Sequence, residues 1–201
     1  DRRPPRIRSG LAGLTWPGLP PRPASQTLAL LYQLEHSQWL PEAELERHQF
    51  RQIQLLLRHA FKSVPYYRAR HGAWGIDLDQ AVTPEILRRH IPILTRPEIQ
   101  QLGEELLSEE FPKGHGKTGE VLTSGSTGRP IRVVKNELTE TFWNALTIRD
   151  HLWHRDPNLR LASIRPLPGN RAPYPEGELF NNWGGMLAQA FANGPSALLN
   201  I

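Results

Sequence analysis

The residues best suited to chemistry lie together in one octapeptide near the middle of the chain. In order, it consists of Thr123, Ser124, Gly125, Ser126, Thr127, Gly128, Arg129 and Pro130. The two glycines allow the backbone to present consecutive N–H groups, and the hydroxyls and the guanidinium add further donors. This donor set suits a polyphosphate, while glycine and hydroxyl residues are also typical of a plain hairpin loop.

A second phosphate-loop candidate fails on spacing. Gly116-Lys117-Thr118 matches the end of a Walker A loop, but that motif requires glycine at position 111, which is Phe111. The octapeptide is not a Walker A loop either, because the β-branched residues 131–134 follow it, whereas a Walker A loop opens into a helix. We therefore expect the octapeptide to join two strands.

Apolar periodicity predicts the elements that position this loop. Helices are expected before Pro41, from Pro41 to Val64, and behind a capping box formed by Thr95 and Glu98. After a polar loop over 113–119, strands are expected at 131–134 and 159–164, with a helix capped by Asn136 between them. A glycine-interrupted helix over 179–192 and a last strand over 197–201 follow.

The fold class that follows is α/β, with an N-terminal helical region followed by the start of a mixed β-sheet subdomain with flanking helices. The expected division is a flexible arm rich in Pro and Arg over 1–25, a helical region over 26–112 and a partial α/β subdomain with the phosphate loop over 113–201.

Composition excludes several classes of protein. The 201 residues contain no cysteine, which excludes disulfide frameworks, thiolate metal sites and cysteine nucleophiles, and favours the cytoplasm. No apolar run approaches the roughly 18 to 20 residues of a membrane span. The first 22 residues hold five Arg and one Asp and so account for the whole net charge of +4. Because the remainder is neutral, specific nucleic-acid binding is not expected.

The order of residues in the octapeptide resembles the phosphate-loop signature of the adenylate-forming superfamily, which includes the acyl-CoA synthetases. The neighbouring sequence looks most like the phenylacetate-CoA ligase branch: segments 64–68 and 91–96 upstream, and 179–180, 184–185 and 194–201 downstream, are similar to segments at comparable places in that branch. The resemblance extends over residues 45–201, and the octapeptide is its most specific part.

This resemblance implies an ATP-dependent ligase. A carboxylate attacks the α-phosphate of Mg-ATP to give an acyl-adenylate and pyrophosphate, and a thiol, usually of coenzyme A, then displaces AMP. The implied cofactors are ATP, Mg²⁺ and coenzyme A, and the substrate is a small carboxylic acid, aromatic acids included. The residues that would bind the β- and γ-phosphates are Thr123, Ser124, Gly125, Ser126, Thr127, Gly128 and Arg129.

Arg129 stands where the family commonly has lysine, which preserves the charge and offers a two-pronged phosphate contact. Phe180, Gly184 and Gly185 fall in the region that forms the acyl pocket of the family. No catalytic or metal-ligating residue is assigned.

Other parts of the family pattern are not found in this sequence: a Tyr-Gly-x-Thr-Glu-like segment, a later ribose-binding Asp and a lid with a catalytic Lys. We therefore expect the N-terminal portion of a longer ligase, a fragment not competent alone, with the remainder as its partner. Two alternatives stay open: a non-catalytic binding or assembly module that keeps a relic loop, and a tether that binds anionic polymers through the basic arm. The acid, the acceptor thiol and homodimer formation are also left open.

Two further groups of residues are expected to be structural. His151 and His154 lie three apart on a predicted helix without a third ligand nearby, so we expect histidines that face solvent rather than a metal site. Four acidic residues are expected to form a solvated face rather than a catalytic pair: Glu104, Glu105, Glu109 and Glu110.

Overall fold

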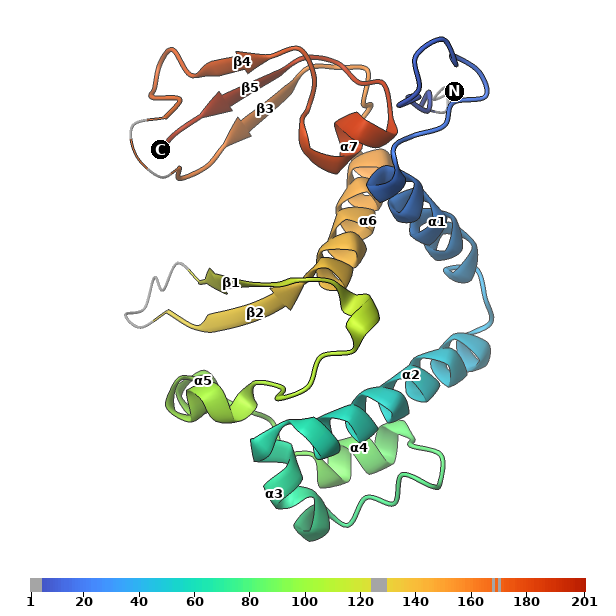
Figure 1. The fold of residues 1–201 in the computed structure, drawn as a ribbon, viewed down its shortest axis with the longest axis vertical. Coiled ribbons are helices and arrows are strands. Elements are labelled where there is room, and N and C mark those ends of the chain that lie inside the picture. The colour runs from blue at the N-terminus through green and yellow to red at the C-terminus, as the bar shows by residue number, and fades with distance from the viewer. Residues whose placement is uncertain (1–4, 124–129, 168, 170) are drawn as a thin grey trace. The chain divides into compact units, whose positions relative to one another are not determined.

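The computed structural model describes residues 5–123, 130–167, 169 and 171–201 (Figure 1). The chain forms two compact units, which we call unit 1 (Asp1–Glu35 with Glu140–Ile201) and unit 2 (His36–Thr139). The fold is mixed α/β, with N-terminal helices followed by two small sheets and interleaved helices, which confirms the predicted fold class. Among the described residues, no helix is long and apolar enough to cross a membrane.

The helices are α1 (Arg22–Ser37), α2 (Glu42–Ser63), α3 (Pro65–Trp74), α4 (Pro84–His90), α5 (Arg96–Leu102), α6 (Glu137–His154) and α7 (Gly185–Ala190), with short 3-10 turns at Gly103–Leu106 and Lys113–His115. The strands are β1 (Thr118–Leu122), β2 (Arg132–Asn136), β3 (Leu161–Ile164), β4 (Glu178–Phe180) and β5 (Ser196–Leu199).

Local signals place the ends of the helices of unit 2. Helix α2 ends at Ser63 because Pro65 restricts Val64 to extended backbone. The capping box of Thr95 and Glu98 opens α5 as predicted, and Gly103, at φ +47°, converts the chain to a 3-10 turn after Leu102. Pro41 is the N-cap of α2 and not its first helical residue, so the helix begins at Glu42, one residue later than expected.

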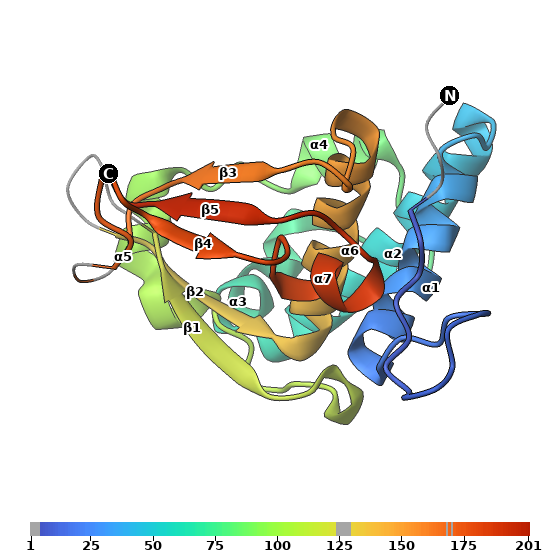
Figure 2. The same ribbon diagram turned by 90° about the horizontal axis from the view of Figure 1, so that it is seen from above.

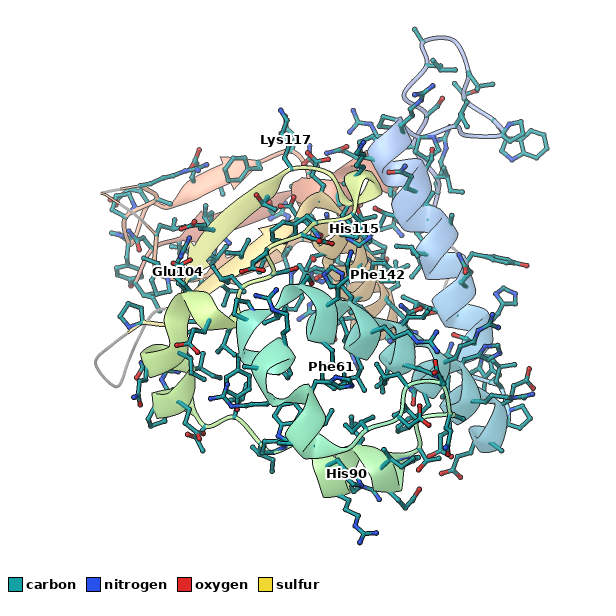
Figure 3. All side chains as sticks on the ribbon, turned by 60° about the horizontal axis from the view of Figure 1, so that its bottom comes forward. Phe61, His90, Glu104, His115, Lys117 and Phe142 are labelled. Atoms are coloured by element: carbon teal, nitrogen blue, oxygen red, sulfur yellow. The ribbon has the colours of Figure 1, made fainter. Side chains whose placement is uncertain are left out.

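Two short helices of unit 2, α3 and α4, were not predicted. Helix α3 follows α2 after one residue, and Thr83 caps α4 by accepting a hydrogen bond from the Ile86 N–H at 3.4 Å. Both pack against α2, where Phe61 (Figure 3) lies in a core that continues into α3 through the ring of Trp74, 6.1 Å from that of Phe61. These helices are stabilised by this contact more than by their own length, since helices of 10 residues or fewer are marginal alone.

The β1–β2 hairpin carries the octapeptide, so the loop joins two strands as predicted. The strands are antiparallel, and Leu122 faces Arg132 in the last pair of the register. Beyond that pair, Thr123 and Ile131 close the base of the loop through two hydrogen bonds, from Thr123 N to Ile131 O at 3.0 Å and from Ile131 N to Thr123 Oγ1 at 2.8 Å. The polar loop expected over 113–119 is shorter than predicted, because β1 already begins at Thr118.

Unit 1 combines a three-stranded sheet with three helices. In the strand order β3-β5-β4, β3 runs parallel to β5 and β4 runs antiparallel to it (Figure 2). Helices α1, α6 and α7 meet at an apolar core (Figure 1) whose buried members include Leu31, Ile148 and Leu187. Instead of the helix predicted over 179–192, the chain forms β4 and then α7.

The N-terminal segment differs from the flexible arm expected over 1–25. Arg8 N–H donates to Ala190 O at 2.9 Å, and Ala192 N–H donates to Arg6 O at 2.8 Å, so residues 6–8 form a short β-type pairing. Residues 6–8 contain no proline and keep their backbone donors, which explains why this stretch pairs. Helix α1 already begins at Arg22, where a proline at the second helical position is tolerated.

Candidate ligand-binding site

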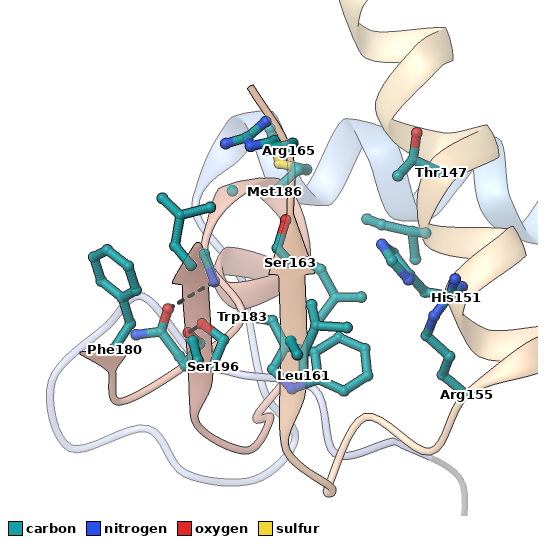
Figure 4. A pocket seen from close by; sticks show the side chains of 18 of the residues that line it. Thr147, His151, Arg155, Leu161, Ser163, Arg165, Phe180, Trp183, Met186 and Ser196 are labelled. Carbon is teal, nitrogen blue, oxygen red and sulfur yellow. Dashed lines mark hydrogen bonds between the residues drawn. The ribbon is translucent and has the colours of Figure 1, made fainter. Parts of the chain in front are cut away.

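The three residues that the sequence assigned to an acyl pocket come together at one cavity in unit 1 (Figure 4). Phe180, Gly184 and Gly185 all line this cavity, which has a volume of about 640 Å³. Its walls are formed by α6, the three strands of the sheet and the segment that enters α7. The volume lies within the range of roughly 300 to 1,000 Å³ that is usual for small-molecule sites. We call it the unit 1 cavity.

One face of α6 forms the first wall. Asn144, Thr147 and His151 recur at steps of three or four residues, which places them on the same side of the helix, and Arg155 follows directly after its last residue. His151 projects from α6 toward β3 (Figure 4). Ile148 lines the cavity on the same side and also belongs to the core, so this wall combines polar groups with an apolar one.

The sheet forms the opposite wall. Ser196 of β5 faces Leu161 of β3 and Phe180 of β4 in the strand register, so the three side chains lie on one face of the sheet. Ser163 extends the same face along β3, since side chains two apart share a side. Ser196 Oγ donates a hydrogen bond to Asn182 O at 2.7 Å, which ties the strand to the segment before α7.

Gly184 and Gly185 turn the chain into α7 at the edge of the cavity. Gly184 has φ +75° and ψ −175°, and Gly185 has φ +58°, conformations that residues with a side chain adopt only with strain. Gly184 N–H donates to Asn182 Oδ1 at 2.9 Å, and Gly184 O accepts from Ala188 N–H at 3.2 Å as the N-cap of α7. A methyl group at either glycine would meet no atom within 4 Å, so backbone conformation, not crowding, requires glycine here.

Both N–H groups of Trp183 donate hydrogen bonds. Its backbone N–H donates to Asn193 Oδ1 at 2.6 Å, and its indole Nε1–H donates to Leu159 O at 3.0 Å. The indole therefore has a fixed orientation and presents an apolar surface to the cavity. It also contacts the His151 ring edge to face, with the ring centroids 5.6 Å apart.

His151 is not the solvent-facing histidine that the sequence predicted. Its Nδ1 is the one buried side-chain nitrogen or oxygen without a hydrogen-bond partner among the described residues. Burial, and secondarily the positive charge of Arg155, lower the pKa of His151, so the imidazole is neutral near pH 7. The prediction was wrong because it rested on the lack of a third metal ligand nearby in the sequence, which does not determine whether His151 faces solvent or the sheet. His154 is exposed as expected.

The charged groups of the cavity share one sign. Three arginines line it, whereas none of the described lining residues is Asp or Glu. Arg155 pairs with Asp150 at 3.1 Å, and Arg171 pairs with Glu178 at 2.8 Å. No described residue makes a hydrogen bond or ion pair with the Arg165 guanidinium. Arg165 therefore contributes an uncompensated positive charge, and no periodic signal in the sequence marked it.

The phosphate-loop residues are only partly described. Thr123, at the end of β1, is exposed and closes the base of the loop. The other six predicted residues, 124–129, lie outside the described residues. At the same end of the hairpin, Arg132 is paired with both Glu104 (Figure 3) and Glu120, so its charge is compensated locally.

The acidic group at the end of α5 is solvated as predicted. All four carboxylates are exposed. Glu109 and Glu110 also form ion pairs, with Arg68 and Lys62 respectively, each at 2.7 Å, and these bonds lower the pKa of both carboxyls. Within 5–123, 130–167, 169 and 171–201, no cluster of three or more His, Asp or Glu residues is arranged to hold a metal ion.

Comparison of the chain with protein-family models finds no match, and neither does comparison with curated proteins.

Proposed function

We propose that this chain supplies the phosphate-binding loop and the acid-binding cavity of an ATP-dependent acyl-adenylate-forming ligase. The observation that carries the proposal is the octapeptide at the end of the β1–β2 hairpin, because its residue order is specific and its place between antiparallel strands differs from a Walker A loop. Phe180, Gly184 and Gly185, which the same resemblance places at the acyl pocket, line one cavity, and this is consistent with the proposal.

The donor set of the loop fits a polyphosphate. Hydroxyl groups at Ser124, Ser126 and Thr127 and backbone N–H groups near the two glycines offer neutral donors, and Arg129 adds a permanent positive charge. We assign the charge to Arg129 rather than to Arg132, because Glu104 and Glu120 already pair with Arg132. The closed base of the loop, between Thr123 and Ile131, fixes the two ends from which these donors extend.

The contribution of the chain to the reaction is positioning and charge neutralisation. When bound, ATP supplies the electrophilic α-phosphorus and the pyrophosphate leaving group. The loop residues hold the β- and γ-phosphates and offset their charge, while the unit 1 cavity holds the acid. The fixed indole of Trp183, together with Phe180 and Leu161, gives the cavity an apolar surface for the body of that acid.

The remaining elements of the reaction enter by the family resemblance alone. These are Mg²⁺, coenzyme A as the thiol, and the adenine, ribose and lid residues of the remainder of the ligase, which acts as a partner to this chain. We place the reaction in the cytoplasm, the compartment that the sequence favoured. A relic loop in a non-catalytic module is the alternative that the experiment below separates.

The proposal is tested by titrating adenosine, AMP, ADP and ATP against the full chain in the presence of Mg²⁺ by calorimetry. If the loop binds the terminal phosphates, affinity rises from AMP to ATP by about tenfold or more, since each charge-assisted contact contributes roughly 1.5 to 3 kcal/mol. Equal affinity for AMP and ATP contradicts the assignment of the loop. Absence of binding by every nucleotide favours the relic module.

A further inference from the structure

The charge of the unit 1 cavity says more about its ligand than the family resemblance does. Three arginines line the cavity. Arg155 and Arg171 are paired with carboxylates that do not line it, whereas Arg165 has no partner among the described residues. Arg165 is exposed, so a hydrocarbon ligand that filled this space would shield the part of its side chain that lines the cavity from water and would offer it no partner. Such dehydration of an unpaired charge is strongly unfavourable. The lining therefore fits a ligand with a negative charge of its own inside the cavity.

The reacting carboxylate of the acid is not suited to bind Arg165. A two-pronged pair with a guanidinium occupies both carboxylate oxygens and stabilises them in the ground state. A nucleophilic carboxylate has to leave such a pair before it can attack phosphorus, so the pair would slow the step that it prepares. The positive charge is better explained by another group of the ligand.

We propose that the acid held in the unit 1 cavity carries a second negatively charged group in addition to the carboxylate that reacts, and that Arg165 binds this second group. The proposal rests on the proposed function, because only adenylation requires one carboxylate to stay unpaired. The substrate class is that of dicarboxylic and similarly charged acids with a planar or compact apolar body. Trp183, Phe180 and Met186 supply the apolar surface against that body.

His151 supplies a neutral donor to the same ligand. Its Nδ1 is buried and has no acceptor among the described residues, so a proton on that nitrogen would be left without a partner. The neutral imidazole therefore keeps its proton on Nε2, the nitrogen that remains to donate a hydrogen bond into the cavity. The edge-to-face contact with Trp183 holds the ring in this orientation.

The test compares two acids that differ in one substituent, phenylacetate and 4-carboxyphenylacetate. Each is titrated calorimetrically against the full chain at pH 7.5 without nucleotide. We expect the dianion to bind about tenfold more tightly or better, as for sites built to pair a specific polar group. Equal or tighter binding of phenylacetate, or no binding of either acid, overturns the proposal.

Two variants attribute the preference to one side chain. Arg165→Gln is expected to reduce the preference to less than about twofold, whereas Arg160→Gln, an exposed arginine just before β3 that does not line the cavity, is expected to retain it. Circular dichroism of these two variants controls for folding. A third variant, Arg165→Lys, keeps the charge and is expected to retain part of the preference for the dianion. A preference that survives in Arg165→Gln refutes the assignment.

The nucleotide titration is scored separately. If ATP binds but the dianion is not preferred over phenylacetate, only the proposal of a second charged group is refuted. If the dianion is preferred but ATP does not bind, the anion site at Arg165 is upheld and the proposed ligase function is refuted.

Discussion

Replacing Gly184 by Ala adds one methyl group at the edge of the unit 1 cavity. The substitution measures how much the backbone conformation at this position contributes to the free energy of unfolding. The new Cβ would have no atom within 4 Å, so the substitution introduces no clash. What remains is the backbone, because φ +75° with ψ −175° is a conformation that only glycine adopts readily. That strain costs about 1 to 3 kcal/mol, partly offset by about 0.4 to 1 kcal/mol from the stiffer unfolded chain.

Near the middle of both ranges, the expected net loss is about 1 to 2 kcal/mol in the free energy of unfolding. Followed by tryptophan fluorescence in urea, this lowers the midpoint by roughly 0.5 to 1 M at a slope of about 2 kcal/mol per M. Gly72→Ala is the matched control, since its Cβ also meets no atom but Gly72 lies inside α3, where alanine is favoured by about 0.5 to 1 kcal/mol. An unchanged or higher midpoint for Gly184→Ala would show that the turn into α7 does not require the left-handed backbone.

Two further predictions concern buried polar groups. The pKa of His151 is lower in the folded protein, so the unfolded chain binds a proton more readily, and stability is lost as the pH falls below about 6.5. His151→Phe should therefore flatten the pH dependence of the urea midpoint between pH 8 and 5, and an unchanged pH dependence in this variant would refute the burial of the imidazole. Ser63 is 1% exposed, donates to His59 O at 2.7 Å and accepts from Ser108 Oγ at 2.9 Å. Ser63→Ala should therefore cost about 1 to 3 kcal/mol in the same assay, and a loss below about 0.3 kcal/mol would contradict that role.

Elements with local signals could be predicted from the sequence. The proline after Val64 ends α2, the Thr95 box opens α5, and Asn136 Oδ1 accepts from Thr139 N–H at 2.8 Å at the start of α6. Each signal acts within a few residues, so the chain itself carries it. The β-branched residues after the octapeptide likewise identified β2, and with it the place of the loop between two strands.

The buried face of α6 could not be predicted in this way. The stripe at helical spacing in this part of the sequence consists of Phe142, Ala145, Leu146, Arg149, Leu152 and Trp153. Ala145 is buried and Leu152 packs against the core, as such a stripe predicts, but Phe142, Leu146 and Trp153 are more than 40% exposed. Ile148, which is 1% exposed and central to the core of unit 1, was not in that stripe. Apolar residues lie around most of this helix, so periodicity alone does not select the face that packs.

The cavity and the N-terminal pairing depend on contacts between distant parts of the sequence. His151, Arg165 and Trp183 come from a helix, a strand end and a loop, and nothing in the local pattern of each indicates a shared cavity. The pairing of residues 6–8 with 190–192 joins segments about 180 positions apart. Such contacts are set by how the elements pack, which local propensity does not encode.

The central claim, that the octapeptide binds the phosphates of ATP, is tested most directly by removing two of its hydroxyls. Mg-ATP is titrated calorimetrically against the full chain, against Ser126→Ala with Thr127→Ala, and against Thr118→Ala, an exposed hydroxyl at the far end of the same hairpin. The account predicts binding by the parent and by Thr118→Ala, and affinity weaker by about tenfold or more in the double variant. Equal affinity of the three proteins, or no binding by the parent, would contradict it.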